Sequence, residues 1–166
     1  MDVIVMEFMD VIRARRSIRR YKPDPVPEDV LNQILEAARL APSGGHRQPW
    51  HFIVVRDPEV KSRLDIPAWA AEAPIIIVGC TDPDVSPRWH IVDLSIAFEH
   101  IVLAAANFGL GTCWIGKLGA DERVKEVLGI PDHMKVVALT PLGYPNETPA
   151  PKVRKSLSEI VHYDKF

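Results

Sequence analysis

The stretch WHIVDLSIAFEHIVLAAANFGLG, residues 89–111, decides the architecture of this chain. It belongs to the longest helical pattern, residues 87–109, and is apolar on nearly every side, with Asp93, Glu99 and His100 among the scattered exceptions. A helix that is apolar all round must be covered all round, and about 20 helical residues span roughly 30 Å. One sheet in a chain of 166 residues cannot readily wrap such a helix, so we expect a second copy of the chain to cover part of it. The alternative is a central core helix in a monomer.

Hydrophobic patterns on both sides of this helix predict a mixed architecture. Short β-branched runs indicate buried strands, and apolar positions at helical spacing indicate amphipathic helices. We predict helices over residues 6–16, from Glu28 to near Pro42, within 57–72 (one helix and a shorter second one) and over 121–130, and strands over 50–55, 73–80, 112–116 and 134–143. Neither an internal repeat nor a linker rich in Gly or Ser divides the chain. We therefore expect one domain, 1–166, that ends in a proline-broken tail.

Composition excludes several classes of function. Charged residues make up 25% of the chain and the formal net charge is −2, so no overall basic field recruits nucleic acid or anionic membrane. No run of about 18 uncharged apolar residues predicts a membrane span, and the start MDVIVMEF lacks the basic region of a signal peptide. Cys80 and Cys113 lie in separate apolar runs, so we expect two reduced core thiols in a cytoplasmic protein rather than a disulfide.

Familiar catalytic motifs give no match. Gly109 and Gly111 form a G-x-G, but a helix precedes it and a strand follows it, which is the reverse of the order that cradles a dinucleotide phosphate. The chain has neither a G-x-x-x-x-G-K-[ST] loop nor a G-x-S-x-G elbow, and its six histidines lack the i+3 or i+4 partners of a metal site. Asp82 and Asp84 flank a proline and predict a turn rather than paired acid-base carboxylates. We therefore expect no metal.

Three clusters remain as candidates for a binding site. RARRSIRRYK, residues 13–22, is either a solvated helix end or a clamp in which guanidinium groups bind an anion. APSGGHRQPWHF, residues 41–52, has small residues that leave room for a flat ring to approach the backbone, whereas a helix ending would need only one glycine. GTCWIG, residues 111–116, is an ordinary buried strand or one whose last glycine offers a further backbone contact. The tail adds Lys152 and Arg154, which are solvent-exposed by default.

Together these motifs resemble the nitroreductase family of FMN-dependent NAD(P)H oxidoreductases. The resemblance runs from about Phe8 to His162 and rests on R-R-S-I-R at 15–19, P-S-G-G-x-R-Q-P-W-H-F at 42–52, G-L-G-T-C-W-I-G at 109–116 and the late P-L-G-Y-P. It implies an α+β fold, a nitroreductase-like three-layer sandwich with a central, mostly antiparallel sheet flanked by helices. It also implies an intertwined homodimer with FMN at two interface sites, in which the C-terminal tail, 146–166, reaches across the dimer.

The resemblance further implies which residues hold the cofactor. By the family pattern, the FMN phosphate and ribityl oxygens would bind at the front arginines and the tail, the pyrimidine edge at Arg19, and the ring at the partner's glycine loop and at the strand that ends in Gly116. The expected cofactor-binding residues are Arg15, Arg16, Ser17, Arg19, Pro42, Ser43, Gly44, His46, Ile115, Gly116, Lys152 and Arg154. No side chain is expected to act as acid or base, because the flavin carries the chemistry and Arg19 stabilises its reduced form.

The implied activity is a ping-pong hydride transfer. NADH or NADPH reduces the flavin and leaves, and a nitroaromatic, quinone or activated alkene then enters the same pocket as electron acceptor. Two alternatives remain: a flavin-binding or sensing module without turnover, and a reductive dehalogenase or flavin-fragmenting relative on the same scaffold.

Two positions depart from the family pattern. His46 stands where the family usually has asparagine, which predicts pH-dependent flavin binding or redox potential. The short segment RLDIPAWAAEAP, residues 63–74, lacks the amide or basic side chain that many members direct at the flavin. Its Trp69 is either a wall of the substrate pocket or an ordinary core residue.

Overall fold

A β-branched strand that is buried along its whole length forms the centre of the molecule. The computed structural model describes residues 7–166, and in this part of the chain β2 (Ile75–Thr81) lies between β1 (Trp50–Val55) and β5 (Lys135–Gly143). The far edge of β5 pairs with two short strands, β3 (Gly111–Thr112) and β4 (Ile115–Gly116), and every pairing in the sheet is antiparallel. A strand covered on both faces carries a continuous apolar run, as the sequence of β2 does.

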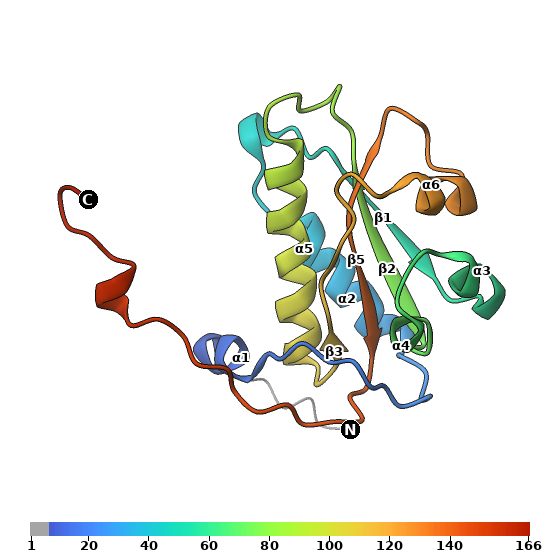
Figure 1. Cartoon of the computed structure of the whole chain (residues 1–166), viewed down its shortest axis with the longest axis horizontal. Coiled ribbons are helices and arrows are strands. Elements are labelled where there is room, and N and C mark those ends of the chain that lie inside the picture. Colours follow the sequence, from blue (N-terminus) through green and yellow to red (C-terminus); the bar gives the residue numbers. More distant parts are fainter. Residues whose placement is uncertain (1–6) are drawn as a thin grey trace.

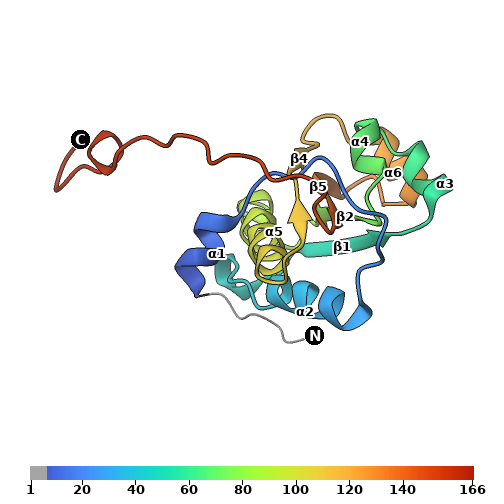
Figure 2. The same cartoon turned by 90° about the horizontal axis from the view of Figure 1, so that it is seen from below.

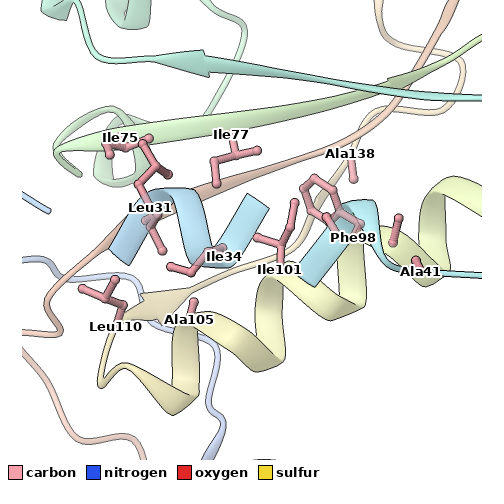
Figure 3. Packing of buried hydrophobic residues seen from close by; sticks show 13 residues of the cluster. Leu31, Ile34, Ala41, Ile75, Ile77, Phe98, Ile101, Ala105, Leu110 and Ala138 are labelled. Carbon is pink, nitrogen blue, oxygen red and sulfur yellow. The ribbon is translucent and has the colours of Figure 1, made fainter. Parts of the chain in front are cut away.

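Helices cover both faces of this sheet, which makes three layers (Figures 1 and 2). The helices are α1 (Phe8–Ala14), α2 (Glu28–Arg39), α3 (Pro58–Arg63), α4 (Ala68–Ala71), α5 (His90–Asn107) and α6 (Glu122–Leu128). On one face Ile75 and Ile77 pack with residues of α2 and α5, including Phe98 (Figure 3). On the other face Ile76 and Val78 pack with Val124 of α6 and the end of α3. The alternation of side chains along β2 therefore builds two separate cores.

The predicted helices and strands are confirmed, with one interruption. The strand expected over 112–116 is divided into β3 and β4, although both halves share one register with β5. That register places Pro141 opposite Cys113, and proline has no N–H to donate to a ladder. The Cys113 N–H instead donates to Thr140 Oγ1 at 3.0 Å, and Trp114 turns its ring edge-on against Phe98. The first predicted helix begins only at Phe8, and residue 6 lies outside the described residues.

Helix α5 is only partly covered within one chain. Its buried face includes Leu94, Phe98 and Ile101, which are fully buried against the sheet and α2. Its other side leaves Val92 49% and Ile96 37% exposed. By length and composition alone α5 is apolar enough to cross a membrane, but a helix packed on a sheet along one face is a core helix. The remaining apolar stripe is the part for which the sequence predicts a partner.

The chain beyond Pro149 runs away from the body as an extended tail (Figures 1 and 2). Its regular structure is one short turn, η2 (Leu157–Glu159), which Ser156 and Glu159 close as a capping box. All of residues 150–166 are exposed, including large apolar side chains such as Leu157 (75%) and Tyr163 (84%). Exposed apolar surface of this extent is typical of a segment that packs against another surface, and the rest of this chain does not provide that surface.

Candidate active site: a cationic groove and a glycine loop

The basic segment after α1 runs in an extended path against β3. Ser17 forms a parallel bridge with Thr112, and the Ile18 N–H donates to the Thr112 carbonyl at 2.8 Å. Gly111 allows this approach, because a Cβ atom there would stand 2.7 Å from the Ile18 side chain. Ile18 is buried whereas Arg19 is exposed. One buried apolar side chain thus sets the register in which the neighbouring arginine reaches the surface.

Two further groups hold the backbone of this segment. The Glu147 carboxylate accepts hydrogen bonds from the N–H groups of Arg19 and Arg20, at 2.5 and 3.2 Å. The Tyr21 hydroxyl donates to the Ile18 carbonyl at 2.5 Å, and burial raises the pKa of Tyr21 well above its usual range. The phenol therefore stays protonated and remains a donor at neutral pH. Glu147 follows β5 in the chain, so the arginine segment is fixed to both β3 and the start of the tail.

A groove of about 490 Å³ gathers most of the cations that the sequence singles out. Its polar lining residues are Arg13, Arg15, Arg16, Ser17, Arg19, Lys152 and Arg154. Within residues 7–166, Arg15, Arg16 and Arg19 form no ion pair with a carboxylate, and Arg16 donates only to backbone carbonyls. Guanidinium groups without a carboxylate partner are a donor set for a phosphate or another anion. The structure thus brings together the front arginines and the two tail cations of the predicted site.

The edge strand β4 supplies Ile115 and Gly116. Gly116 is exposed, and no protein atom lies within 4 Å of the place where a Cβ atom would stand. Packing within this chain therefore does not require glycine at this position, whereas the close approach of a ligand would. The next residue, Lys117, turns inward and is only 7% exposed, with its Nζ 2.8 Å from the Asp65 carboxylate. That ion pair holds the pKa of Asp65 below its usual value.

The glycine loop is fastened to the N-terminal end of α5. The buried Asp93 carboxylate accepts hydrogen bonds from the Gly44 N–H at 2.8 Å and from the Ser86 hydroxyl at 3.0 Å. The loop backbone is left-handed at Gly45, His46 and Gln48, with φ angles of 60°, 56° and 49°, and it is strained at the two residues that are not glycine. Left-handed backbone is uncommon outside glycine and gathers at functional sites. The Asp93 carboxylate of α5, itself oriented by the Ser86 hydroxyl, therefore anchors a loop with an otherwise unfavourable conformation.

The two halves of the predicted site lie at opposite ends of α5 (Figure 1). Asp93, which holds the glycine loop, is in the first turns of the helix, whereas Ala106 near its end lines a hollow of about 370 Å³ together with Arg15 and Arg16. Thirteen helical positions separate Asp93 from Ala106, which corresponds to about 20 Å along the axis. A single chain therefore does not bring residues 42–46 to the cationic groove.

The acidic pair between β2 and α5 forms the predicted turn. The Asp84 N–H donates to Asp82 Oδ1 at 2.8 Å, which is the short-range bond typical of an aspartate turn. His133, from the loop before β5, joins the pair, and one potential ligand atom from each of the three residues lies within 4.8 Å of the others. Spacing along the sequence could not reveal this grouping, because His133 is about fifty positions away.

Sequence reasoning missed the residues that position the others. Asp93 was noted only as a polar exception on an apolar helix, and Glu147 and the Lys117–Asp65 pair were not singled out. Each of them acts on a partner far away in the chain, as in the bond from Arg19 to Glu147, so no local pattern marks it.

An antiparallel sheet between two helical layers, with a groove lined by arginines beside its edge strand, defines an α+β sandwich whose surface offers donors suited to an anionic ligand. The model of the nitroreductase family matches residues 12–73 and 65–144, which is most of the described chain. The chain therefore belongs to the nitroreductase family, and as a member it is an oxidoreductase.

Individual relatives are similar to this chain over most of their own length. A relative from Methanothermobacter thermautotrophicus, provisionally named NADH dehydrogenase/NAD(P)H nitroreductase, is 38% identical over 87% of this chain and 80% of its own. An NADH dehydrogenase from Thermus thermophilus is 34% identical over 89% of this chain and 91% of its own. The solved structure of an FMN-dependent nitroreductase from Clostridium difficile superposes with a TM-score of 0.83 at 33% identity, covering 95% of this chain and 99% of its own.

Proposed function

We propose that this protein uses NAD(P)H and FMN to reduce nitroaromatics, quinones or activated alkenes by a ping-pong hydride transfer. The observation that carries the proposal is the groove in which five cationic or hydroxyl groups of the predicted phosphate clamp meet, none of them paired with a carboxylate of residues 7–166. The names of the relatives and of the structural neighbour support the same cofactor pair. When bound, FMN supplies the hydride chemistry, and the chain supplies binding, orientation and electrostatics.

The groove fits FMN by its chemistry and by its open glycine. Guanidinium groups of Arg15 and Arg16, with the Ser17 hydroxyl and the tail cations, would bind the phosphate and the ribityl oxygens, each charged hydrogen bond contributing about 1.5–3 kcal/mol. Arg19, farther along the same groove, would place its charge where the reduced cofactor becomes negative. The open space beside Gly116 admits a planar ring to the backbone of β4.

We further propose that the active unit is a homodimer and that each site joins the groove of one copy to residues 42–46 of the other. Asp93, which holds the glycine loop, and Ala106, which lies beside Arg15 and Arg16, are about 20 Å apart along α5. One chain also leaves apolar surface uncovered on α5 and on α1, where Phe8 is 66% exposed. A second open groove of about 610 Å³ lies between α1, α2 and α5. In this proposal residues 1–166 are one FMN-binding domain whose tail, 146–166, reaches across the dimer.

Light scattering coupled to size-exclusion chromatography tests the assembly. The expected mass is twice the 18.6 kDa of the chain, with one FMN per copy. A monomer that binds FMN with full occupancy would contradict the proposal that two copies share each site.

The dehalogenase alternative has support of its own, because iodotyrosine deiodinase 1 from Rattus norvegicus is 29% identical over 93% of this chain and 68% of its own. The relatives named NAD(P)H nitroreductase or NADH dehydrogenase have higher identities, 38% and 34%, and favour the activity proposed first. Buried free thiols at Cys80 and Cys113 support the proposed location in the cytoplasm, because that compartment keeps thiols reduced.

Anaerobic spectroscopy of the purified protein tests the proposed activity. We expect a yellow protein whose flavin absorption is bleached by NADH or NADPH and restored by a quinone or nitroaromatic in successive half-reactions. A bound flavin that neither nicotinamide reduces would contradict the oxidoreductase proposal. Steady oxidation of NAD(P)H in the presence of a quinone separates this enzyme from a flavin carrier without turnover.

A further inference from the structure

Helix α4 places an aromatic ring against the arginine at the far end of the groove. The guanidinium carbon of Arg19 lies 5.8 Å from the centre of the Trp69 ring, within the range of a cation–π contact. Among the described residues the Arg19 guanidinium forms no ion pair and no hydrogen bond, and only the backbone N–H of Arg19 donates to a carboxylate, that of Glu147. An arginine that lies over a ring keeps its in-plane N–H donors free, because all five point outward from the guanidinium plane. Trp69 therefore holds this charge without using its hydrogen-bonding capacity.

The segment that carries Trp69 is itself fastened to the rest of the protein. The buried Lys61 Nζ donates to the Ala73 carbonyl at 2.6 Å, just after α4. Burial lowers the pKa of Lys61, but the bond to the carbonyl needs only a donor. Before α4, Asp65 pairs with Lys117, the residue that follows Gly116 on β4. The position of the Trp69 ring is thus tied to the strand edge that forms the other border of the proposed flavin site.

We propose that Trp69 is a positioning residue for Arg19, and that it thereby sets how readily the bound flavin accepts a hydride. This inference rests on the proposed function of the groove. A free arginine side chain loses rotamer entropy when it is ordered, and an exposed charge that moves into water is screened. A ring that holds the guanidinium in advance lets the charge act on the reduced cofactor without reorganisation at the moment of reaction. The Lys117–Asp65 pair maintains this arrangement by holding α4.

Replacing the ring in steps tests the proposal in the FMN-loaded protein. Trp69→Phe retains a weaker π face, and Trp69→Leu retains only apolar bulk. We expect the flavin midpoint potential, measured by anaerobic spectroelectrochemical titration, to become more negative from Trp to Phe to Leu. The rate constant of flavin reduction should fall in the same order.

A double-mutant cycle with Arg19 separates positioning from packing. In an Arg19→Gln background the Trp69 substitutions should cause no further shift in potential, because the charge that they position is gone. Equal potentials in the wild type and Trp69→Leu, with FMN bound and reducible, would overturn this inference and leave the proposed function intact. Failure of the wild type itself to bind or reduce FMN would instead overturn the proposed function. If Trp69→Leu does not fold, Trp69→Phe alone and in the Arg19→Gln background still decides the question.

Discussion

At the scale of single residues, Asp93 shows how a buried charge can organise a loop. Its side chain is 2% exposed and has no cationic partner among the described residues. It is satisfied instead by the Gly44 N–H and the Ser86 hydroxyl, and it lies in the first turns of α5, where the helix dipole favours negative charge. A buried carboxylate is tolerated when such donors surround it. The strained glycine loop therefore depends on a single acceptor from another element.

Removing that acceptor should loosen the loop. We expect Asp93→Ala to destabilise the protein by about 1–3 kcal/mol, because two buried donors lose their partner. If the loop completes the partner's site, FMN affinity should also fall, by roughly tenfold for each 1.4 kcal/mol of lost positioning. Chemical denaturation and FMN titration by fluorescence measure the two effects. Ser95→Ala on the same helix is the matched control, because Ser95 Oγ bonds only the Ile91 carbonyl of its own helix, and it should change neither quantity.

Substitution by alanine should affect stability differently at Gly116 and at Gly111. Gly116→Ala should leave the free energy of unfolding within about 0.5 kcal/mol of the wild type, because a Cβ atom there meets nothing within 4 Å. It should nevertheless weaken FMN binding, since the methyl group occupies the space proposed for the ring. Gly111→Ala should destabilise the protein by about 1–3 kcal/mol, because its Cβ atom would stand 2.7 Å from Ile18. Unchanged FMN affinity in Gly116→Ala would place the flavin elsewhere.

At the scale of elements, the joint between α6 and β5 depends on one buried acid. Asp121 precedes α6 and accepts hydrogen bonds from the Val136 N–H at 3.1 Å, with Lys125 Nζ at 3.3 Å. Burial alone would raise the pKa of Asp121, but the bond from Val136 and the pairing with Lys125 outweigh it, and the net pKa is lowered. The ionised form is therefore favoured by folding.

This joint predicts a pH dependence of stability. A carboxyl group whose pKa is lower in the folded protein contributes its full stability above the unfolded pKa of about 3.9. That contribution is lost as the pH falls through the lower pKa of the folded state. Denaturation of wild type and Asp121→Asn from neutral pH to pH 2 should show a difference in stability that shrinks only below about pH 4. Glu36→Gln, at an exposed pair with Arg39 on α2, is the control and should have little effect at any pH. A difference that already disappears between pH 5 and 7 would contradict the assignment.

The same scale shows what the sequence could predict. Helices and buried strands follow from patterns within a dozen residues, and those of α2, α5, β1 and β2 are found where the patterns place them. The break between β3 and β4 was missed, because its cause, Pro141, lies on another strand. The cationic and glycine-rich members of the candidate site were recognisable by residue type. Their supports, Asp93 and Glu147, were not, because a hydrogen-bond partner some fifty or more residues away leaves no local periodicity.

At the scale of the whole molecule, the sheet and α5 separate two unlike surfaces, which are the two halves of the proposed site. One of these surfaces carries the arginines of residues 13–20 and the root of the tail, and the other carries the glycine loop. The apolar stripe of α5 with Val92 and Ile96 runs between them and remains open. In the proposed dimer, a two-fold axis would bring the glycine loop of one copy to the arginines of the other.

The two halves of the proposed site can be damaged separately, and this predicts that two different variants restore each other in a mixed dimer. A chain with Arg15→Ala and Arg16→Ala and a chain with Gly45→Val, at a backbone φ of 60°, should each give a colourless homodimer. Refolded together at equal amounts, they should regain yellow colour in about a quarter of all sites, because each mixed dimer joins one intact groove to one intact loop and two damaged halves to each other. Complementation of this kind needs no new contact. It needs only two variants, one damaged near the last turns of α5 and the other near its first turns.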